Sequence, residues 1–448
     1  MRAAQEQERL IDGLSVQVSE MGVWVIDQFR KSLSPEHLAA VQDFVRSGLL
    51  NVERRIRDLR RRTPRKKRYQ AECREADAAT RRRIGEHNDH ARRRDRALIT
   101  HRNILRQIGD ACAWVVLREN ARIISVLFDE TKQHHLAEGI GLAGPLELAQ
   151  RAHRSGEFYV IENDLTRCLG TGDITVVRTN GRWLRPLTLE VKSTGEFREG
   201  AMLGVHLVTA SSDSPVDEML LGDFVRILNM EVREGTQIPR NAIRQSKELL
   251  TRSELMLALT TTRATQLGQP TRALWQSLQE VLDEAGERGF AFREVESGVV
   301  YLGVDTERAE DPKTFAEHIR TELRTAGYAP DNNPWHAIST EEMRENDATS
   351  AYVAPIALWD LRPETRVALL SGRMYFQCIY DPAVWENALR EFGIVMQIDP
   401  DGDGWVLRKG KQLAQLGAVE VQCIRAGLAF SGMSPTELAE RIRHGFSA

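Results

Sequence analysis

The run GDITVVRTNGRWLRPLTLEVKS, residues 172–193, carries the signals that decide the fold. Apolar and polar residues alternate at both of its ends, which is typical of two half-buried β-strands. Between them stands Asn180-Gly181, a pair that tolerates positive φ and favours a two-residue hairpin turn. In the second strand, Glu190 and Lys192 lie two residues apart, on the side opposite to the apolar residues. The run therefore predicts a hairpin with an acid and a lysine on one face.

The two-residue turn also predicts the register of this hairpin. Asp173 then lies opposite Thr188, and Glu190 lies one diagonal step further along. Opposed residues share a face, as do residues two apart on one strand, so Asp173, Glu190 and Lys192 share one face. Diagonal neighbours lie roughly 7–8 Å apart at the backbone, which lets two carboxylates converge on one cation. A bulge at Pro186 would shift this register.

An arrangement of two acids and a lysine suits phosphodiester hydrolysis. A hard divalent cation on the phosphate requires oxygen ligands, which Asp and Glu supply. A nearby lysine stabilises charge on the attacking or pentavalent oxygens. The alternative is an exposed ion pair on a sheet face with no chemical role.

The order of motifs over residues 140–250 resembles the PD-(D/E)xK nuclease superfamily, and looks like its resolvase-type subset. The core of that family is a helix, a three-stranded meander, a helix and a strand. The matching motifs here are a helix pattern LELAQRAHRSG, then G-x-F-x-V-x-x-N, GDI and EVK. The resemblance implies an α/β fold with a restriction-endonuclease-like mixed-sheet core.

The resemblance also implies roles for individual residues. Its metal ligands match Asp173, Glu190 and Glu147, which would bind Mg²⁺ or Mn²⁺, and Lys192 would position or activate the attacking water. A Gln or basic residue on the following helix matches Gln245 or Lys247, although about fifty residues separate Lys192 from Gln245. Two further acids are alternatives to Glu147 as the additional ligand: Glu162 and Asp164.

The composition of the chain limits the classes of protein to which it can belong. The chain has 448 residues, 42% hydrophobic and 28% charged, which is ordinary for a globular protein and long enough for two or three domains. It has no run of about 18 apolar residues and no apolar leader, so we expect a cytoplasmic protein that does not bind a membrane. The five cysteines are scattered, which argues against a disulfide framework and a cysteine zinc site.

Charge is distributed unevenly along the chain. Residues 53–107 hold 20 Lys and Arg against 8 Asp and Glu, a local charge of +12 in a chain whose net charge is −3. A tract of this kind often binds polyanions, and phosphate contacts supply most non-specific affinity for nucleic acid. The alternative is a solvated helical hairpin or a coiled-coil arm for oligomerisation. The predicted nucleic-acid contacts are Arg54, Arg57, Arg61, Arg65, Lys66, Lys67, Arg68, Arg82 and Arg93.

The periodicity of the rest of the chain predicts its organisation. A helix starts at Ser34 and Pro35 and continues to about Arg62. The C-terminal part predicts helix 271–286, hairpin strands around 289–303, helix 311–326, strand 373–380, helix 381–393 and hairpin 394–408. We therefore expect a basic helical arm (1–108), a nuclease core (109–265) and an α+β domain of unknown role (266–448).

These observations predict a metal-dependent endonuclease, with DNA as the expected substrate and a homo-oligomer or partner protein as further possibilities. By analogy with bacterial nucleases of this build, a role in defence against phage or plasmids is one setting for it. A nucleic-acid-binding scaffold without turnover and a coiled-coil interaction protein are the rival hypotheses.

Overall fold

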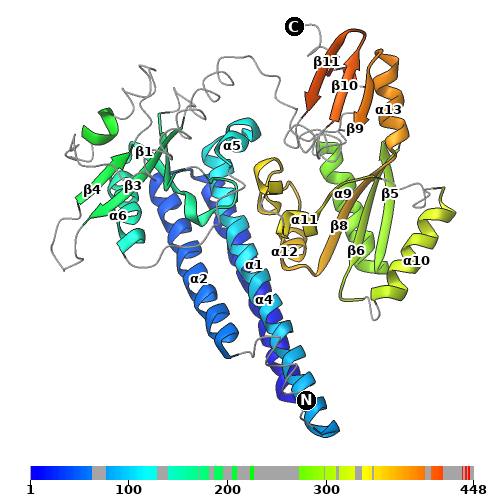
Figure 1. The fold of residues 1–448 in the computed structure, drawn as a ribbon, viewed down its shortest axis with the longest axis horizontal. Helices are drawn as coiled ribbons and strands as arrows, with labels where there is room; N and C mark the ends of the chain where they lie inside the picture. Colours follow the sequence, from blue (N-terminus) through cyan, green and yellow to red (C-terminus); the bar gives the residue numbers. More distant parts are fainter. Residues whose placement is uncertain are drawn as a thin grey trace. The chain divides into compact units, whose positions relative to one another are not determined.

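The computed structural model contains helices and antiparallel sheets, which Figure 1 shows in chain order. It describes residues 2–62, 77–128, 140–170, 172–180, 186–194, 204–208, 222–226, 272–296, 298–308, 312–327, 335–345, 348–398, 405–416, 436, 439–440 and 442–443. The predicted mixture of helix and sheet is confirmed. Within these ranges, no helix combines the length and the apolar character that crossing a bilayer requires.

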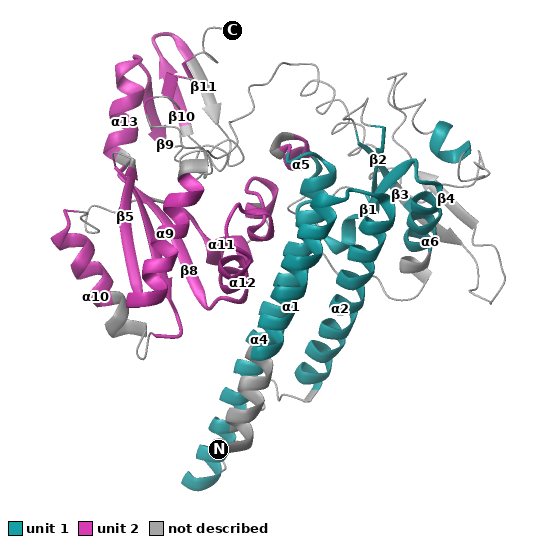
Figure 2. Ribbon diagram, turned by 180° about the vertical axis from the view of Figure 1, so that it is seen from behind, with its two compact units in different colours: residues 1–119, 127–258 teal, residues 120–126, 259–448 magenta. Residues whose placement is uncertain are grey.

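The chain divides into two compact units, which Figure 2 colours separately. Unit 1 comprises residues 1–119 and 127–258, and unit 2 comprises residues 120–126 and 259–448. The predicted basic arm and most of the predicted core fall within unit 1. A single helix, α4 (Ala78–Val116), crosses the predicted arm boundary at residue 108.

Three long helices of unit 1 pack against one another: α1 (Arg2–Lys31), α2 (Pro35–Arg62) and α4. The predicted start of α2 is confirmed, because Ser34 Oγ accepts a hydrogen bond from the His37 N–H at 3.2 Å. Pro35 occupies the first helical position, where its missing N–H has no cost. The helix ends at Arg62, where the sequence predicts an interruption.

Two glycines allow these helices to approach closely. A Cβ at Gly22 on α1 would lie 2.2 Å from Ile108 Cδ1, and a Cβ at Gly48 on α2 would lie 2.8 Å from Leu105 Cδ2. Real Cβ atoms do not reach such distances, so both positions require glycine or a shift of the α4 side chain. The same helix α4 is therefore packed tightly from two sides.

The sheet of unit 1 follows the three helices. Helix α6 (Ile140–Ser155) precedes strands β1 (Phe158–Glu162), β2 (Ile174–Arg178), β3 (Leu187–Thr194) and β4 (Gly204–Val208), which pair in that order. A 3-10 turn, η1 (Asn163–Leu165), follows β1 directly. The helix and the three-stranded meander thus appear in the predicted order.

The described sheets differ from the predicted mixed sheet, because every strand pair in them is antiparallel. A parallel neighbour requires a crossover of a dozen or more residues. Only residues 195–203 separate β3 from β4, so the fourth strand pairs antiparallel to the third.

The predicted register of the β2–β3 hairpin is wrong by two residues. Thr175 pairs with Thr188, where the two-residue turn would place Asp173. The last described pair is Val176 with Leu187, and Pro186, which has no N–H for a ladder, directly precedes it. A shift by an even number of residues leaves every side chain on its predicted face.

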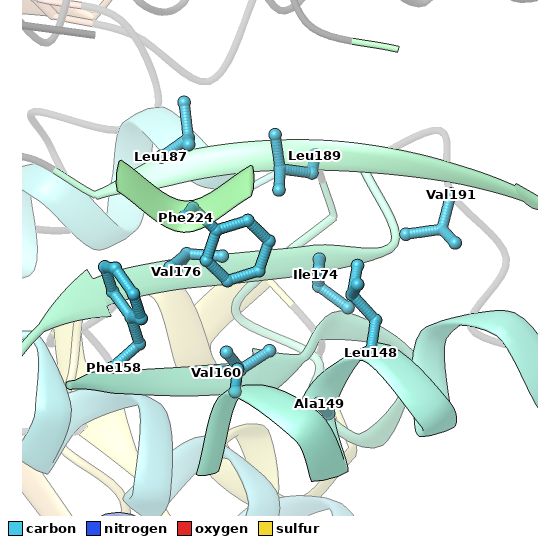
Figure 3. Close-up of a cluster of buried hydrophobic side chains, with 11 residues drawn as sticks. Leu148, Ala149, Phe158, Val160, Ile174, Val176, Leu187, Leu189, Val191 and Phe224 are labelled. Atoms are coloured by element: carbon cyan, nitrogen blue, oxygen red, sulfur yellow. The ribbon is translucent and has the colours of Figure 1, made fainter. Parts of the chain in front are cut away.

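One face of this sheet forms the core of unit 1. Figure 3 shows side chains of β1, β2 and β3 packed against Leu148 and Ala149 of α6. Phe224, from the short helical segment 222–226, covers the same face and meets Phe158 edge to face at 5.2 Å. The core-facing strand residues are Phe158, Val160, Ile174, Val176, Leu187, Leu189 and Val191.

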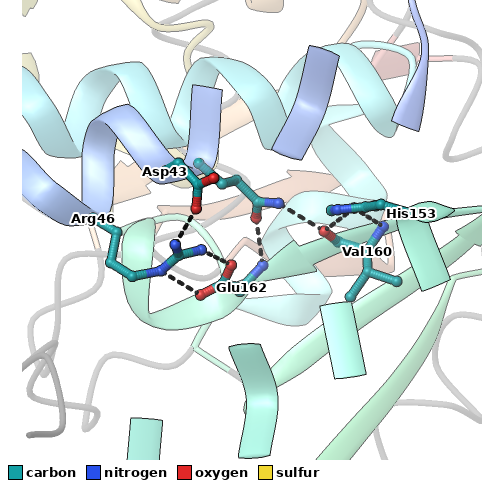
Figure 4. A network of polar contacts seen from close by, with 6 residues as sticks. Asp43, Arg46, His153, Val160 and Glu162 are labelled. Carbon is teal, nitrogen blue, oxygen red and sulfur yellow. Dashed lines mark hydrogen bonds and ion pairs between the residues drawn. The ribbon is translucent and has the colours of Figure 1, made fainter. Parts of the chain in front are cut away.

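The free edge of β1 is covered by side chains instead of a further strand. Gln42 on α2 donates from Nε2 to the Val160 carbonyl at 2.9 Å and accepts from the Glu162 N–H at 2.7 Å. His153 Nε2 on α6 lies 3.1 Å from both the N–H and the carbonyl oxygen of Val160 (Figure 4). An exposed row of backbone groups would invite pairing with another chain. These two side chains satisfy that edge and fix β1 against two helices.

Unit 2 contains a second four-stranded sheet in the order β5-β6-β8-β7 and a three-stranded sheet in the order β11-β10-β9. The helices and strands predicted at 271–303, 311–326 and 373–408 are present within a few residues of their expected bounds, whereas the elements between residues 335 and 371 and the strand at 412–416 were not predicted. The elements are α5 (Ala121–Leu127), α9 (Arg272–Arg288), β5 (Phe290–Glu296), β6 (Val299–Asp305), α10 (Pro312–Thr325), β7 (Trp335–Ser339), α11 (Thr340–Glu345), η3 (Ala348–Ala351), η4 (Ile356–Leu358), α12 (Pro363–Ser371), β8 (Met374–Tyr380), α13 (Pro382–Glu391), β9 (Val395–Ile398), β10 (Trp405–Lys409) and β11 (Gln412–Leu416).

Candidate functional site

The Gly172-Asp173 pair directly precedes β2, and only glycine fits at position 172. Gly172 adopts φ +73°, a left-handed conformation that other residues rarely adopt. A Cβ there would lie 2.9 Å from the Leu189 carbonyl oxygen and 2.8 Å from Thr188 Cγ2. The backbone of β3 therefore passes too close for any side chain at position 172. This close approach brings Asp173 next to β3.

Asp173 contacts β3 on both sides of Glu190. Its N–H donates to the Leu189 carbonyl at 2.9 Å, and its carboxylate oxygen Oδ2 accepts from the Val191 N–H at 2.7 Å. Glu190 therefore lies between the two points at which Asp173 contacts the neighbouring strand. The structure brings Asp173 and Glu190 closer along the strands than the predicted diagonal, because of the two-residue shift in register.

Lys192 follows Glu190 by two residues and lies on the same side of β3 by strand alternation. Both residues also pair with β4, Glu190 with Val208 and Lys192 with His206. The side chains of Glu190 and Lys192 lie outside the part of the chain that the structure describes. The backbone therefore brings Asp173, Glu190 and Lys192 to neighbouring positions at one end of the β2–β3 pair.

Glu147 lies on α6, and its place differs from that of Asp173. Its carboxylate pairs with Arg151 at 2.7 Å, one turn further along the exposed side of the helix. The neighbouring Leu148 packs on the sheet face that carries Ile174, opposite to the face of Asp173 (Figure 3). The contacts that the structure describes for Glu147 do not include the Asp173 end of β2.

Glu162, an alternative to Glu147, has a structural explanation. It is 3% exposed and forms an ion pair with Arg46 of α2, which also contacts Asp43 (Figure 4). Burial raises the pKa of Glu162, and the Arg46 guanidinium opposes this by favouring the charged carboxylate. Two nitrogens of Arg46, Nε and Nη2, each donate a hydrogen bond to the Glu162 carboxylate. This ion pair fixes the end of β1 to the arm.

Asp164 and Gln245 complete the predicted set. Asp164 lies half-buried in η1, where its backbone carbonyl accepts a hydrogen bond from Arg106 of α4. Burial lowers the pKa of Arg106 to about 10. Gln245, like Lys247, lies outside the residues that the structure describes, so its predicted role stays a prediction.

The donor chemistry of Asp173 and Glu190 suits Mg²⁺ or Mn²⁺. Both residues offer carboxylate oxygens, the donors that these hard cations prefer. A carboxylate has about four lone-pair positions, and the Val191 N–H occupies one of those of Asp173. Among the described side chains, no three His, Cys, Asp or Glu residues gather around one metal position, and Glu190 is not among those side chains.

No known family model, curated protein or solved structure matches this chain.

The predicted nucleic-acid contacts lie along α2 and α4. Arg54, Arg57, Arg61, Arg82 and Arg93 are exposed, while the predicted contacts at 65–68 lie outside the described residues. Several arginines in the arm form ion pairs within it. These pairs are Arg60 with Asp95 at 3.1 Å, Arg82 with Glu86 at 3.1 Å, Arg92 with Asp89 at 3.8 Å and Arg102 with Glu53 at 3.7 Å.

Asn163 is a residue of this region to which the sequence alone assigns no role. It is completely buried at the first position of η1, directly after β1, and bonds to the Gly172-Asp173 segment. The signal for it was its place as the final residue of G-x-F-x-V-x-x-N. Periodicity does not reveal what such a side chain contacts, since its partners lie on the next strand.

Proposed function

We propose that this protein is a metal-dependent nuclease that hydrolyses phosphodiester bonds in DNA. The observation that carries the proposal is the contact of Asp173 with β3 on both sides of Glu190, with Lys192 two residues further along. Two acids and one lysine are thereby gathered at one end of the β2–β3 pair. The restriction-endonuclease-like core is part of this proposal and rests on the order of α6, β1, β2 and β3.

Asp173 and Glu190 would hold the cation, and Glu147 stays a predicted third ligand. A bound Mg²⁺ or Mn²⁺ supplies Lewis acidity at the phosphate oxygens. Lys192 would orient the attacking water and stabilise negative charge that develops on the phosphate. The hydrogen bond from the Val191 N–H to Asp173 would keep that carboxylate oriented toward β3.

The arm would hold the substrate by its phosphates. Arg54 and Arg61 are exposed on α2, seven residues or about 10 Å apart along the helix axis. Each phosphate contact contributes a slope of about −0.9 to the plot of log affinity against log salt. In a DNA-binding titration without divalent metal, the double variant Arg54→Gln, Arg61→Gln should weaken binding and reduce the slope by up to about 2.

The test of the proposed activity is a cleavage assay with purified protein. Plasmid, linear duplex and single-stranded DNA, and RNA, are incubated with Mg²⁺, Mn²⁺ or EDTA. We expect DNA cleavage with either cation and none with EDTA, and a loss of about 10²-fold or more in rate for Lys192→Ala. Lys411→Ala, an exposed lysine of unit 2, is the matched control and should cleave like the wild type.

The nuclease proposal fails if the wild type and Lys192→Ala behave alike on every substrate. One observation favours a scaffold without turnover as the second candidate. The hydrogen bond that Asp173 accepts from Val191 gives this carboxylate a structural role that needs no metal. Tight, salt-dependent DNA binding without metal-dependent cleavage would support the scaffold.

A further inference from the structure

Asn163 connects β1 to the segment that carries Asp173. Its N–H donates to the Asp173 carbonyl at 2.9 Å, and its side-chain Nδ2 donates to the Gly172 carbonyl at 3.4 Å. Its side-chain Oδ1 accepts from the Thr175 hydroxyl at 2.9 Å. Asn163 and Thr175 are both 0% exposed. One buried side chain thus bonds to residues on both sides of Asp173.

The opposite side of the same segment faces β3. There Asp173 donates to the Leu189 carbonyl and accepts from the Val191 N–H, and Gly172 lies against Thr188. The segment is therefore held between Asn163 on one side and β3 on the other. The main chain of Asn163 makes one of its three hydrogen bonds to residues 172–175, and its side chain makes the other two.

We propose that Asn163 is a positioning residue that holds Asp173 in the orientation in which its carboxylate serves the metal site. This inference rests on the proposed nuclease function. A metal ligand must be held within about 0.5 Å of its productive position, usually by hydrogen bonds to groups behind it. Asn163 acts on Asp173 through Gly172 and Thr175, without contacting the substrate.

Gln42 provides a matched control for a purely structural effect. It is also a buried side-chain amide, 3% exposed, and it also makes two hydrogen bonds next to β1. Its bonds reach the outer edge of β1, whereas those of Asn163 reach β2. Gln42→Leu therefore removes comparable contacts and leaves the Gly172-Asp173 segment intact.

The experiment measures amide hydrogen exchange at Val191 and the Mg²⁺ midpoint of DNA cleavage in the full-length protein. The Val191 N–H reports directly on Asp173, because Oδ2 of that residue is its acceptor. Compared with the wild type, Asn163→Ala should exchange at least about tenfold faster at Val191 and need at least about tenfold more Mg²⁺. Gln42→Leu should leave both quantities within about twofold of the wild type, even if it unfolds at a lower temperature.

A second pair of variants serves if Asn163→Ala does not fold. Thr175→Val keeps the shape of the side chain and removes the donor to Asn163 Oδ1, so it should shift both quantities in the same direction by a smaller factor. Thr175→Ser keeps the hydroxyl and should restore them.

Unchanged exchange at Val191 in a folded Asn163→Ala or Thr175→Val variant would overturn the proposal, as would equal changes in Gln42→Leu. The exchange measurement needs no cleavage. If the wild type does not cleave DNA, the nuclease function fails, while faster exchange at Val191 in Asn163→Ala would still show that Asn163 holds Asp173.

Discussion

Both units contain a four-stranded antiparallel sheet, but different interactions fix the two sheets in place. In unit 1, buried charges connect the sheet region to the helices, and both acids that are fully buried among the described residues, Asp110 and Glu162, belong to it. In unit 2, buried aromatic side chains contact one another, with Trp359 next to Trp275 and Phe376. Buried ion pairs contribute little net stability, but they select one arrangement in some proteins. We infer that unit 1 is built to hold its strand ends in fixed positions.

The largest difference in stability loss between the two units is expected for a substitution of Asp110. This acid on α4 is 0% exposed, bonds to Arg167 Nε at 3.0 Å and accepts the N–H groups of Arg167 and Cys168. Asp110→Ala leaves a buried guanidinium and two N–H groups without their acceptor, which should cost about 3–5 kcal/mol. Denaturant-dependent hydrogen exchange should show that loss in unit 1 and little change in unit 2. Equal losses in both units would contradict the division.

A comparable change in unit 2 has a different physical origin. Trp359 is 2% exposed, lies 5.5 Å from Trp275 and 6.0 Å from Phe376 between ring centroids, and donates to the Ala354 carbonyl at 2.9 Å. Trp359→Ala should cost about 3–5 kcal/mol through the cavity that it leaves. The same exchange measurement should locate this loss in unit 2. Trp359→Phe should lose less stability than Trp359→Ala, because phenylalanine keeps most of the volume of the side chain.

A smaller, pH-dependent effect is expected in unit 1. Burial lowers the pKa of His153 to about 4. The carboxylates of Glu36 and Asp43 on α2 raise this pKa, and the Arg46 guanidinium lowers it further. Because the unfolded imidazole titrates near 6.5, the unfolded state binds more protons between about pH 4 and 6.5. The stability of unit 1 should therefore fall as pH decreases through this range, by at most about 3 kcal/mol from His153.

His153→Gln isolates this contribution, because it removes the ionisable group. The free energy of unfolding of unit 1 is measured for the wild type and the variant by urea-dependent hydrogen exchange at pH 7.0, 5.5 and 4.5. The variant should lose less stability than the wild type on acidification. Parallel pH profiles would show that His153 does not titrate on unfolding.

Local elements could be predicted from the sequence to within a few residues. The cap at Ser34, the end of α2 at Arg62 and the elements predicted at 271–326 and 373–408 follow from periodicity and turn residues, which act over short stretches of chain. The register of the β2–β3 pair could not, because the Asn180-Gly181 signal sets the register only if these two residues form the turn, and the strand pairs are shifted by two residues from that arrangement. Faces were predicted correctly, since an even shift preserves them.

Long-range polar contacts were out of reach of the sequence. Arg46 and Glu162 are separated by 116 residues, and Asp110 and Arg167 by 57, so no local pattern pairs them. The sequence alone therefore leaves Glu162 as an alternative metal ligand, and its ion pair with Arg46 is visible only in the structure. The side chain of Asn163 is a similar case, because its role depends on carbonyls of the adjacent strand.

The central claim is that Asp173 and Glu190 share one cation, and a crystal structure of the full-length protein with Mn²⁺ tests it most directly. Anomalous scattering identifies the ion independently of any assumption about the site. We predict one Mn²⁺ bound by carboxylate oxygens of Asp173 and Glu190 at roughly 2.0–2.3 Å, with the Val191 N–H still bonded to Asp173. Ordered carboxylates at both positions with no anomalous peak between them, at a Mn²⁺ concentration that supports cleavage, would contradict it.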